Sequence, residues 1–252
     1  MTTTVDRKKN RDERSLQDNE DDEKRMTIIE HLEELRHRLM VSAIALLVGA
    51  LAGFVFLADW VIRVLKDKAG DVPFIAIEVT ETLGVWMKIA LYAGAAIAMP
   101  VIVYEAIMFV APALTKQEKK YFFWLLPGVI ISFVIGVVFG YFVLLPPALN
   151  FLLHFKGEFV QIQPRLGNYV STVTKLLFWI GVVFETPVII FFLAKMHIVN
   201  AKMLSRFRKY AFVASFILGA IITPTFDPVN QTLVALPLII LYEIGILLAR
   251  IA

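Results

Sequence analysis

Carboxylates within apolar segments are the side chains of this sequence most able to do chemistry. Glu185 stands in the middle of an apolar run, in Phe184-Glu185-Thr186-Pro187. A carboxylate at mid-membrane depth costs on the order of 3 kcal/mol, so it normally faces the protein interior or a water-filled cavity. Glu243 stands nearer the end of its apolar run, where a side chain can reach the interface. We therefore predict a functional role for Glu185, whereas for Glu243 an interfacial position stays open.

A second group of carboxylates precedes the first apolar run. Glu30, Glu33 and Glu34 are followed by Arg36 and Arg38. Apolar residues recur in this segment at spacings of four and three, which predicts one stripe of an amphipathic helix: Ile28, Leu32, Leu35 and Leu39. The acids then gather on the polar side of that helix. A solvated interfacial helix with Glu34 paired to Arg38 at i, i+4 also explains the pattern.

Two further polar segments adjoin apolar runs. Phe109-Val-Ala-Pro-Ala-Leu114 leads into Thr115 and Glu118, whose spacing fits a capping box. Asp227 before Pro228 fits an N-cap followed by proline at the first helical position, and Gln231 follows one turn later. Helix capping alone explains both segments, and their spacing alone does not indicate a binding site.

The composition is that of a multi-pass membrane protein. Of 252 residues 58% are apolar and 19% are charged, and many of the charges fall within the first 25 residues. Six apolar spans can be drawn, and each must be helical in lipid: 39–58, 84–111, 121–144, 173–194, 211–222 and 231–249. We predict an all-α fold with six transmembrane helices, and two domains: a disordered charged tail (1–25) and a membrane domain (26–252).

Span length and proline content refine this prediction. A bilayer core of about 30 Å needs about 20 helical residues, so the fifth span is too short to cross it, and we predict that helices five and six are both short. Prolines inside the second, fourth and sixth spans predict kinks: Pro100, Pro187 and Pro237.

Lysine and arginine are distributed unevenly between the links, which predicts the orientation. With both termini cytoplasmic, the links between spans two and three and between spans four and five face the cytoplasm and carry most of the basic residues: Lys116, Lys119, Lys120, Lys195, Lys202, Arg206, Arg208 and Lys209. The opposite links carry fewer in proportion to their length: Arg63, Lys66, Lys68, Lys156 and Arg165. We therefore predict that both termini are cytoplasmic, and we expect a multi-pass protein of the inner or plasma membrane.

Several function classes lack the residues they need. The sequence has no cysteine, no Gly-Lys-Ser/Thr nucleotide loop and no His-Glu-x-x-His, and all four histidines fall outside the spans. It also lacks the interleaved basic and aromatic pattern of nucleic-acid binders. We expect no enzyme, no cofactor, no metal site and no nucleic-acid partner.

Taken together, the polar segments resemble the TatC family of the twin-arginine protein translocase. The resemblance runs in order from about Met26 to Ala252 and rests on four segments: His31-Leu-x-Glu-Leu-Arg36-x-Arg38-Leu39, Phe109-Val-Ala-Pro-Ala-Leu114 with Glu118-Lys-Lys, Phe184-Glu185-x-Pro187-Val, and Thr223-Pro through Asp227 to Gln231. The charged tail of residues 1–25 and the near absence of a C-terminal tail depart from the family's pattern.

The resemblance implies a signal-peptide receptor. Such proteins recognise peptides with two consecutive arginines on the cytoplasmic face, and they export folded cargo with TatA- and TatB-type single-span partners, driven by the proton-motive force. It implies that Glu34 and Glu118 accept the arginines, that Phe109 and Leu114 shape the site, and that the basic residues Arg36 and Arg38 balance the acids.

The resemblance also implies intramembrane contacts. It places partner helices near spans five and six, where Asp227, Gln231 and Glu243 stand, and Glu185 in an inward-facing polar surface. We hypothesise that Glu185 offers a partner's polar residue or a water chain a place in the membrane. Contacts with lipid and self-association in a larger complex are expected as well.

Two other function classes stay open from the residues alone. A secondary transporter of a small solute could use Glu185 and Glu243 as proton-coupled carboxylates, although no internal repeat is visible. An intramembrane hydrolase is disfavoured by the placement of the histidines.

Overall fold

The computed structural model describes the chain at residues 28–70, 72–110, 118–154, 163–223 and 227–252, with the side chains at 28, 110, 118–125 and 152–154 outside that description. The predicted domain boundary after residue 25 also lies outside the described residues. The chain divides into two compact units, residues 1–41 and 42–252, which are considered separately below.

The first apolar run is the centre of a much longer helical segment. Helix α2 (Ile28–Ala52) leads through a π-helical turn, η1 (Gly53–Leu57), into α3 (Ala58–Ala69). The sequence analysis treated residues 59–83 as a link, and that was wrong for its first half. Helix α3 is amphipathic, and its apolar residues Val61 and Leu65 pack on the core, which extends the helix beyond the apolar run.

The middle of the chain forms two further long helical segments. Helix α4 (Glu81–Val110) runs through Pro100 as one helix. Helix α5 (Glu118–Phe139) continues through a second π-helical turn, η3 (Gly140–Leu144), into α6 (Leu145–His154). The predicted third span therefore ends ten residues too early, because α6 continues the helix past Pro146 and Pro147.

The last part of the chain contains five helices. They are α7 (Leu166–Phe184), α8 (Thr186–Lys195), α9 (Ala201–Arg206), α10 (Arg208–Ile222) and α11 (Pro228–Ile251). Helix α10 has 15 residues, about 22 Å at 1.5 Å per residue, so the predicted short fifth helix is confirmed. Helix α11 has 24 residues, and the prediction that the sixth helix is short was wrong.

Five helical segments of the described chain are long and apolar enough to cross a membrane: Ile29–Ala69, Glu81–Phe109, Leu126–Phe151, Leu166–Lys195 and Pro228–Ile251. Helix α10 is too short to count among them, so a sixth span stays a prediction. The chain is nevertheless a multi-pass membrane protein of helices, as the composition predicts.

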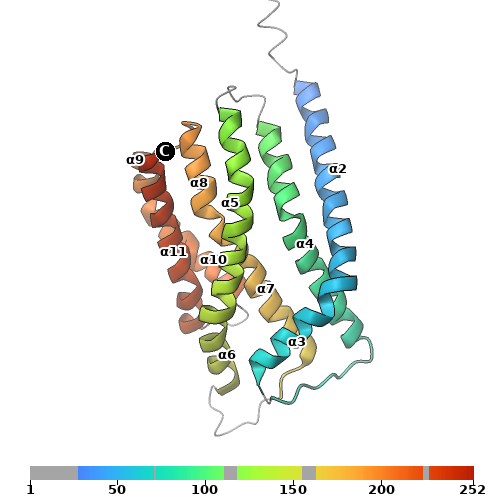
Figure 1. Cartoon of the computed structure of the whole chain (residues 1–252). Coiled ribbons are helices and arrows are strands. Elements are labelled where there is room, and N and C mark those ends of the chain that lie inside the picture. Colours follow the sequence, from blue (N-terminus) through green and yellow to red (C-terminus); the bar gives the residue numbers. More distant parts are fainter. Residues whose placement is uncertain (1–27, 71, 111–117, 155–162, 224–226) are drawn as a thin grey trace, which may run out of the picture. The chain divides into compact units, whose positions relative to one another are not determined.

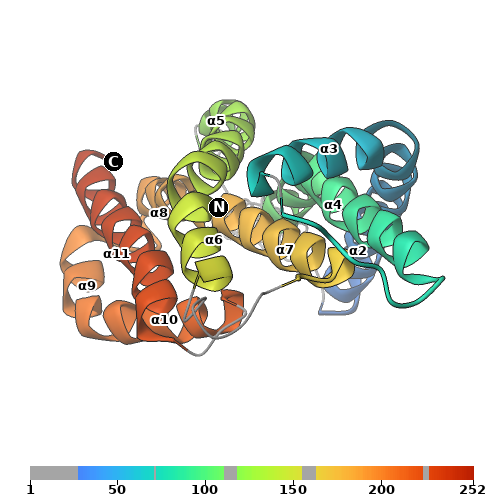
Figure 2. The same cartoon turned by 90° about the horizontal axis from the view of Figure 1, so that it is seen from below.

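Within residues 42–252 the helices pack around α7. It contacts α3, α4, α5, α10 and α11, and Figures 1 and 2 show it running through the middle of this unit. Its inward-facing residues Val170, Val173 and Ile180 are almost completely buried. The C-terminus lies at the end of this unit opposite α3 (Figure 1).

Helices α2 and α4 cross unusually closely in this unit, and glycines permit it. A Cβ atom on Gly94 would lie 2.4 Å from Ala50 Cα, and one on Gly49 would lie 2.5 Å from the Gly94 carbonyl oxygen. Small residues at a crossing allow helix backbones to approach in lipid, where no hydrophobic force pulls helices together.

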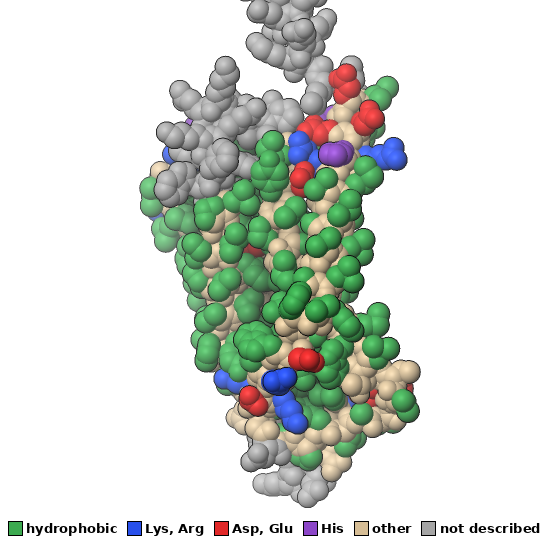
Figure 3. Space-filling model, turned by 45° about the vertical axis from the view of Figure 1, so that its right-hand side comes forward, with side chains coloured by type: hydrophobic (Ala, Val, Ile, Leu, Met, Phe, Trp, Pro, Cys, Tyr) green, Lys and Arg blue, Asp and Glu red, His purple; other side chains and the backbone are tan. Residues whose placement is uncertain are grey.

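The surface of residues 42–252 is mostly apolar. Hydrophobic side chains cover the helices, and charged side chains gather at the end where α3 lies (Figure 3). Exposed large apolar residues occur on most of the long helices, for example Leu91, Ile131 and Leu247. Such a surface suits hydrocarbon as its solvent.

Candidate functional site

The N-terminal half of α2 carries an acidic face. Glu30, Glu33 and Glu34 line a surface hollow of about 500 Å³ together with Arg36, His37 and Met40. The helical repeat brings these residues together, because positions three and four apart share a face. Three predicted site residues, Glu34, Arg36 and Arg38, therefore belong to one helix within residues 1–41.

The carboxylate of Glu34 is only half satisfied. Its Oε1 accepts hydrogen bonds from Arg38 Nε at 2.9 Å and Arg38 Nη2 at 2.5 Å, so the predicted i, i+4 pair is confirmed. Its Oε2 lies 3.8 Å from His31 Nδ1 and accepts no hydrogen bond from the described residues. The Glu34 and Arg38 side chains are 16% and 18% exposed, so this acceptor is partly desolvated.

The second predicted binding segment is described only in part. Phe109 is half-buried near the C-terminal end of α4, and Glu118 is the first residue of α5. The Glu118 side chain, Leu114 and Thr115 lie outside the described residues, so the roles predicted for them stay predictions.

Glu185 marks a break within the fourth predicted span. Helix α7 ends at Phe184 and α8 begins at Thr186, as expected beside Pro187, which has no N–H for the helix ladder. The Ser132 hydroxyl of α5 donates to the carbonyl of Phe184 at this break. Glu185 is 3% exposed, and its Oε1 accepts no hydrogen bond from the described part of the chain. The carboxylate therefore faces the protein interior, as the cost of burial in lipid predicts.

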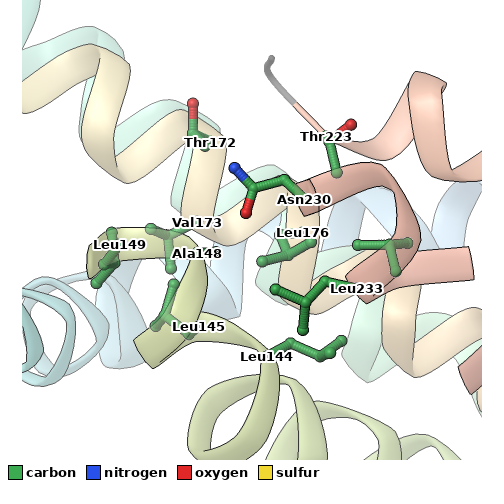
Figure 4. Close-up of a pocket in the computed structure, with 11 residues that line it drawn as sticks. Leu144, Leu145, Ala148, Leu149, Thr172, Val173, Leu176, Thr223, Asn230 and Leu233 are labelled. Atoms are coloured by element: carbon green, nitrogen blue, oxygen red, sulfur yellow. The ribbon is translucent and has the colours of Figure 1, made fainter. Parts of the chain in front are cut away.

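The start of α11 carries a compact polar cluster. Asp227 accepts a hydrogen bond from the Asn230 backbone N–H at 2.7 Å, which confirms the predicted N-cap. The Asn230 amide points from α11 toward Thr172 of α7, beside a cavity of about 20 Å³ (Figure 4), which is room for about one water molecule. Asp227 and Asn230 therefore have a structural role in starting α11.

Gln231 joins the two last helices. Its Nε2 donates to the Phe216 carbonyl of α10 at 2.9 Å. It also lines a surface groove of about 460 Å³ that runs along α10, where Phe212, Val213 and Ile217 are each more than half exposed. Lys175 Nζ donates to the Ile221 carbonyl at 2.6 Å and so caps the C-terminal end of the same short helix.

Glu243 has a cation as its partner. Its Oε2 accepts a hydrogen bond from Arg208 Nη2 at 2.7 Å, and both side chains are about half exposed. This ion pair joins α11 to the first residue of α10. The half-exposed side chain of Glu243 agrees with the interfacial position that the sequence left open for it.

The sequence analysis missed one polar cluster, at the end of the molecule where α3 lies. Glu81 Oε2 accepts from the Ile77 N–H at 3.0 Å and from Arg165 Nη2 at 3.1 Å, and its Oε1 accepts from the Gly167 N–H at 2.9 Å. The hydrogen bond from Arg165 to Glu81 raises the pKa of Arg165. No local signal could have revealed this cluster, because Arg165 and Gly167 are more than 80 residues from Glu81 in the sequence.

Within the described residues, no group of three His, Cys, Asp or Glu side chains could hold a metal ion. The arrangement instead offers carboxylates as hydrogen-bond acceptors. A carboxylate with one buried oxygen that accepts no hydrogen bond from the described residues, such as Glu34, has the chemistry to accept a guanidinium or ammonium group.

Comparison with known proteins gives one consistent result. A family model described as Sec-independent protein translocase protein (TatC) matches residues 30–237. The Sec-independent protein translocase protein TatC of Aquifex aeolicus is 41% identical over 233 residues, which cover 90% of this chain and 96% of the relative. The protein of the same name from Carboxydothermus hydrogenoformans is 37% identical over 91% of this chain and 95% of the relative.

Solved structures agree. Two crystal structures of the twin arginine translocase receptor TatC, one of them in DDM, are similar to this chain at 40% and 41% identity. Their TM-scores are 0.78 and 0.80, and the matches cover 88% and 87% of this chain and 99% of each of those chains.

Proposed function

The chain belongs to the TatC family, and from that premise we propose that Glu34 and Glu118 bind the two arginines of a twin-arginine signal peptide. The chain is a core subunit of the twin-arginine protein translocase, which is a transport component. The proposal concerns how this subunit recognises its cargo.

The half-satisfied carboxylate of Glu34 carries the proposal. One oxygen is held by Arg38 and the other accepts no hydrogen bond from the described residues. Arg38 therefore orients the carboxylate and offsets part of its charge, while we assign Oε2, which is buried and accepts no hydrogen bond from the described residues, to a second guanidinium. A carboxylate can accept from two guanidinium groups because it has two oxygens and about four lone-pair sites.

The chemistry of this acceptor favours arginine over lysine. Arginine presents a planar fork of N–H donors that matches carboxylate geometry and is less strongly hydrated than an ammonium group. The acceptor oxygen is largely excluded from solvent, so a ligand must shed water to reach it. Lysine loses more hydration on entry and makes fewer directed hydrogen bonds.

Two arginines require two acceptors, and we assign the second to Glu118 at the N-terminus of α5. A carboxylate there is also favoured by the helix dipole. We further assign Phe109 and Leu114 to apolar contacts with the peptide. Arg36, which lines the acidic hollow of α2, balances the charge of the three glutamates when no peptide is bound.

We assign the groove along α10 to the TatA- and TatB-type single-span partners. It presents aromatic and aliphatic side chains beside the Gln231 amide, on a helix of only 15 residues. An apolar partner helix could cover this face, and polar groups beside it strengthen helix pairing in lipid. Self-association within a larger complex would use surface of the same apolar kind.

Glu185 is assigned a role in the membrane interior. Because Glu185 is almost completely buried, a small water molecule can reach it more readily than a side chain of a partner can. Of the two roles hypothesised from the sequence, we therefore favour the water chain. Glu185→Gln should preserve assembly and activity because it keeps hydrogen bonding, whereas Glu185→Leu should not. Equal activity of the two variants in an export assay would contradict this role.

In this proposal both termini are cytoplasmic, and the proton-motive force drives export of folded cargo across the inner or plasma membrane. Labelling of single cysteines introduced at positions 4 and 252 tests the orientation. A reagent that cannot cross the membrane should label neither position in intact cells and both after lysis.

Photocrosslinking of a twin-arginine signal peptide tests the receptor proposal. Wild type should crosslink to the arginine peptide and not to a twin-lysine control, and Glu34→Ala and Glu118→Ala should each weaken the signal. Equal crosslinking of the two peptides, or a signal that survives both substitutions together in a stably inserted protein, would contradict the proposal.

A further inference from the structure

An apolar cavity of about 410 Å³ lies within residues 42–252, beneath α3. Its walls come from four helical segments, with α3 on one side and α4, α5 with η3, and α7 around the rest; residues lining it include Trp60, Val64, Ala96, Phe133, Phe142 and Phe178. None of the contacts assigned above to signal peptides or partner subunits uses this cavity.

The cavity opens to the membrane-facing surface. Trp60 and Phe142, which line it, are 62% and 64% exposed. On the opposite side, α3 is held against α7, since the buried Tyr169 hydroxyl of α7 donates to the Leu65 carbonyl of α3 at 2.6 Å. Helix α3 is amphipathic and carries one tryptophan, Trp60, near its start, which suits a helix at the boundary between headgroups and acyl chains. We therefore expect the cavity beneath this helix at the depth where acyl chains join their headgroups.

A cation stands beside the cavity. Lys68 Nζ lies 4.7 Å from the ring centroid of Tyr141 and 5.3 Å from that of Phe142, and both rings line the cavity. Within the described residues, no carboxylate lies within 4.0 Å of this ammonium group. Its charge is thus complementary to an anionic group at the interface, directly above an apolar space.

The size of the cavity selects its occupant. The cavity is enclosed between four helical segments, so an occupant must enter it and cannot simply lie along one helix, and a transmembrane helix about 10 Å wide does not fit between walls that enclose about 410 Å³. A single hydrocarbon chain is of the right order. The walls offer hydrocarbon almost nothing polar besides the Thr174 hydroxyl, which has no hydrogen-bond partner in the described structure.

We propose that this cavity is a binding site for one phospholipid, with an acyl chain between α3, α4, α5 and α7 and the phosphate against Lys68. The bound lipid fills the space beneath α3 and fixes the angle of that helix against the bundle. The proposal does not depend on the signal-peptide site, which lies on residues 1–41 and at the start of α5.

Native mass spectrometry of the purified protein tests the proposal by counting retained phospholipids. Wild type should retain one phospholipid after extensive detergent washing. Ala96→Phe, which fills the cavity, should reduce retention roughly tenfold or more, because a hydrophobic ligand loses about tenfold for every two methylenes displaced. Lys68→Gln should reduce it about two- to fivefold, the effect of a partly exposed ion pair.

Lys66→Gln is the matched control, since it removes the same charge from the exposed neighbour of Lys68 on α3. Its retention should equal that of wild type. Retention that falls equally in both lysine variants, or that is unchanged in Ala96→Phe, would overturn the site. So would a wild-type protein that retains no lipid.

A second measurement covers the case in which Ala96→Phe does not fold. In vesicles of phosphatidylcholine with a few per cent of chain-brominated phosphatidylglycerol, Trp60 fluorescence should be quenched more than random mixing predicts. Comparison with Trp60→Phe isolates its signal, and Lys68→Gln should lower the quenching. Quenching at the random level in wild type would overturn the proposal.

Discussion

Two glutamates of this chain each pair with an arginine, yet their surroundings differ. Glu81 accepts from two backbone N–H groups and from Arg165, so both of its oxygens are occupied by the chain itself. Among the described residues Glu34 accepts hydrogen bonds only from Arg38, a neighbour on the same helix, and its Oε2 accepts none.

The difference separates a structural acid from a binding acid. The contacts of Glu81 join the segment after α3 to the start of α7, and Trp86 Nε1 adds a hydrogen bond to Asp59 at 2.8 Å nearby. The contact between Glu34 and Arg38 lies within helix α2, so it does not connect separate segments of the chain. A carboxylate whose two oxygens both accept hydrogen bonds from the chain stabilises the fold, whereas one with an oxygen that lacks a hydrogen bond can accept a ligand.

The largest effect is expected at the structural acid. Glu81→Ala should lower the thermal unfolding temperature by several degrees and reduce the amount of folded protein in the membrane, because it leaves the N–H groups of Ile77 and Gly167 without their acceptor and removes the nearer carboxylate from Arg165. Thermal unfolding of detergent-purified protein measures it. An unchanged unfolding temperature would remove the basis of the comparison.

For Glu34, the acid proposed to bind the peptide, substitution should change the peptide affinity and not the stability. Glu34→Ala should weaken twin-arginine peptide binding about 10- to 100-fold, the effect of losing a charge-assisted hydrogen bond worth about 1.5–3 kcal/mol. Its unfolding temperature should stay close to that of wild type, since an i, i+4 pair stabilises a helix by only about 0.3–0.5 kcal/mol. A large drop in stability without a drop in affinity would reverse the two roles.

Added salt should weaken peptide binding at Glu34 more than it weakens the stabilising contacts of Glu81. Raising ionic strength from about 0.1 M to about 0.5 M shortens the screening length from about 10 Å to less than half of that. We expect peptide affinity to fall about threefold, while thermal stability changes little, because the backbone N–H bonds to Glu81 are not screened. Titration calorimetry and thermal unfolding in the same buffers check both halves.

The smallest effect should come from the internal guanidinium. Arg38→Gln frees the second oxygen of Glu34 and should tighten peptide binding about twofold, the size of a partly exposed ion pair. Arg36→Gln is the comparison, because Arg36 lines the same hollow but forms no ion pair with Glu34 within the described residues, so its loss should change affinity less than the loss of Arg38 does. Weaker binding in Arg38→Gln would show that Arg38 orients the carboxylate more than it competes for it.

Local features of the fold and site could be read from the sequence. The Glu34–Arg38 pair and the Asp227 cap were predicted because both depend on residues within one helical turn. The burial of Glu185 was predicted because lipid makes an exposed carboxylate costly. The apolar runs predicted the centres of the long helices, because an apolar segment in lipid must be helical.

The helix ends and the distant contacts could not be read in this way. Helix α3 extends beyond the apolar run because its packing face, with Val61 and Leu65, is only half of its surface. Helix α7 begins at Leu166, seven residues before the predicted start, because Arg165 and Gly167 are held by Glu81 from another part of the chain. Such contacts depend on tertiary structure, which no spacing in the sequence encodes.

A double-mutant cycle between Glu34 and the signal peptide tests the central claim most directly. Affinity is measured for wild type and Glu34→Gln, each with the arginine peptide and with peptides that carry lysine at one arginine position. We predict a coupling free energy of about 1–2 kcal/mol between Glu34 and one of the two arginines, and none when Glu33→Gln takes the place of Glu34→Gln. Additive effects at both arginine positions would contradict the claim that the open oxygen of Glu34 binds the twin-arginine signal.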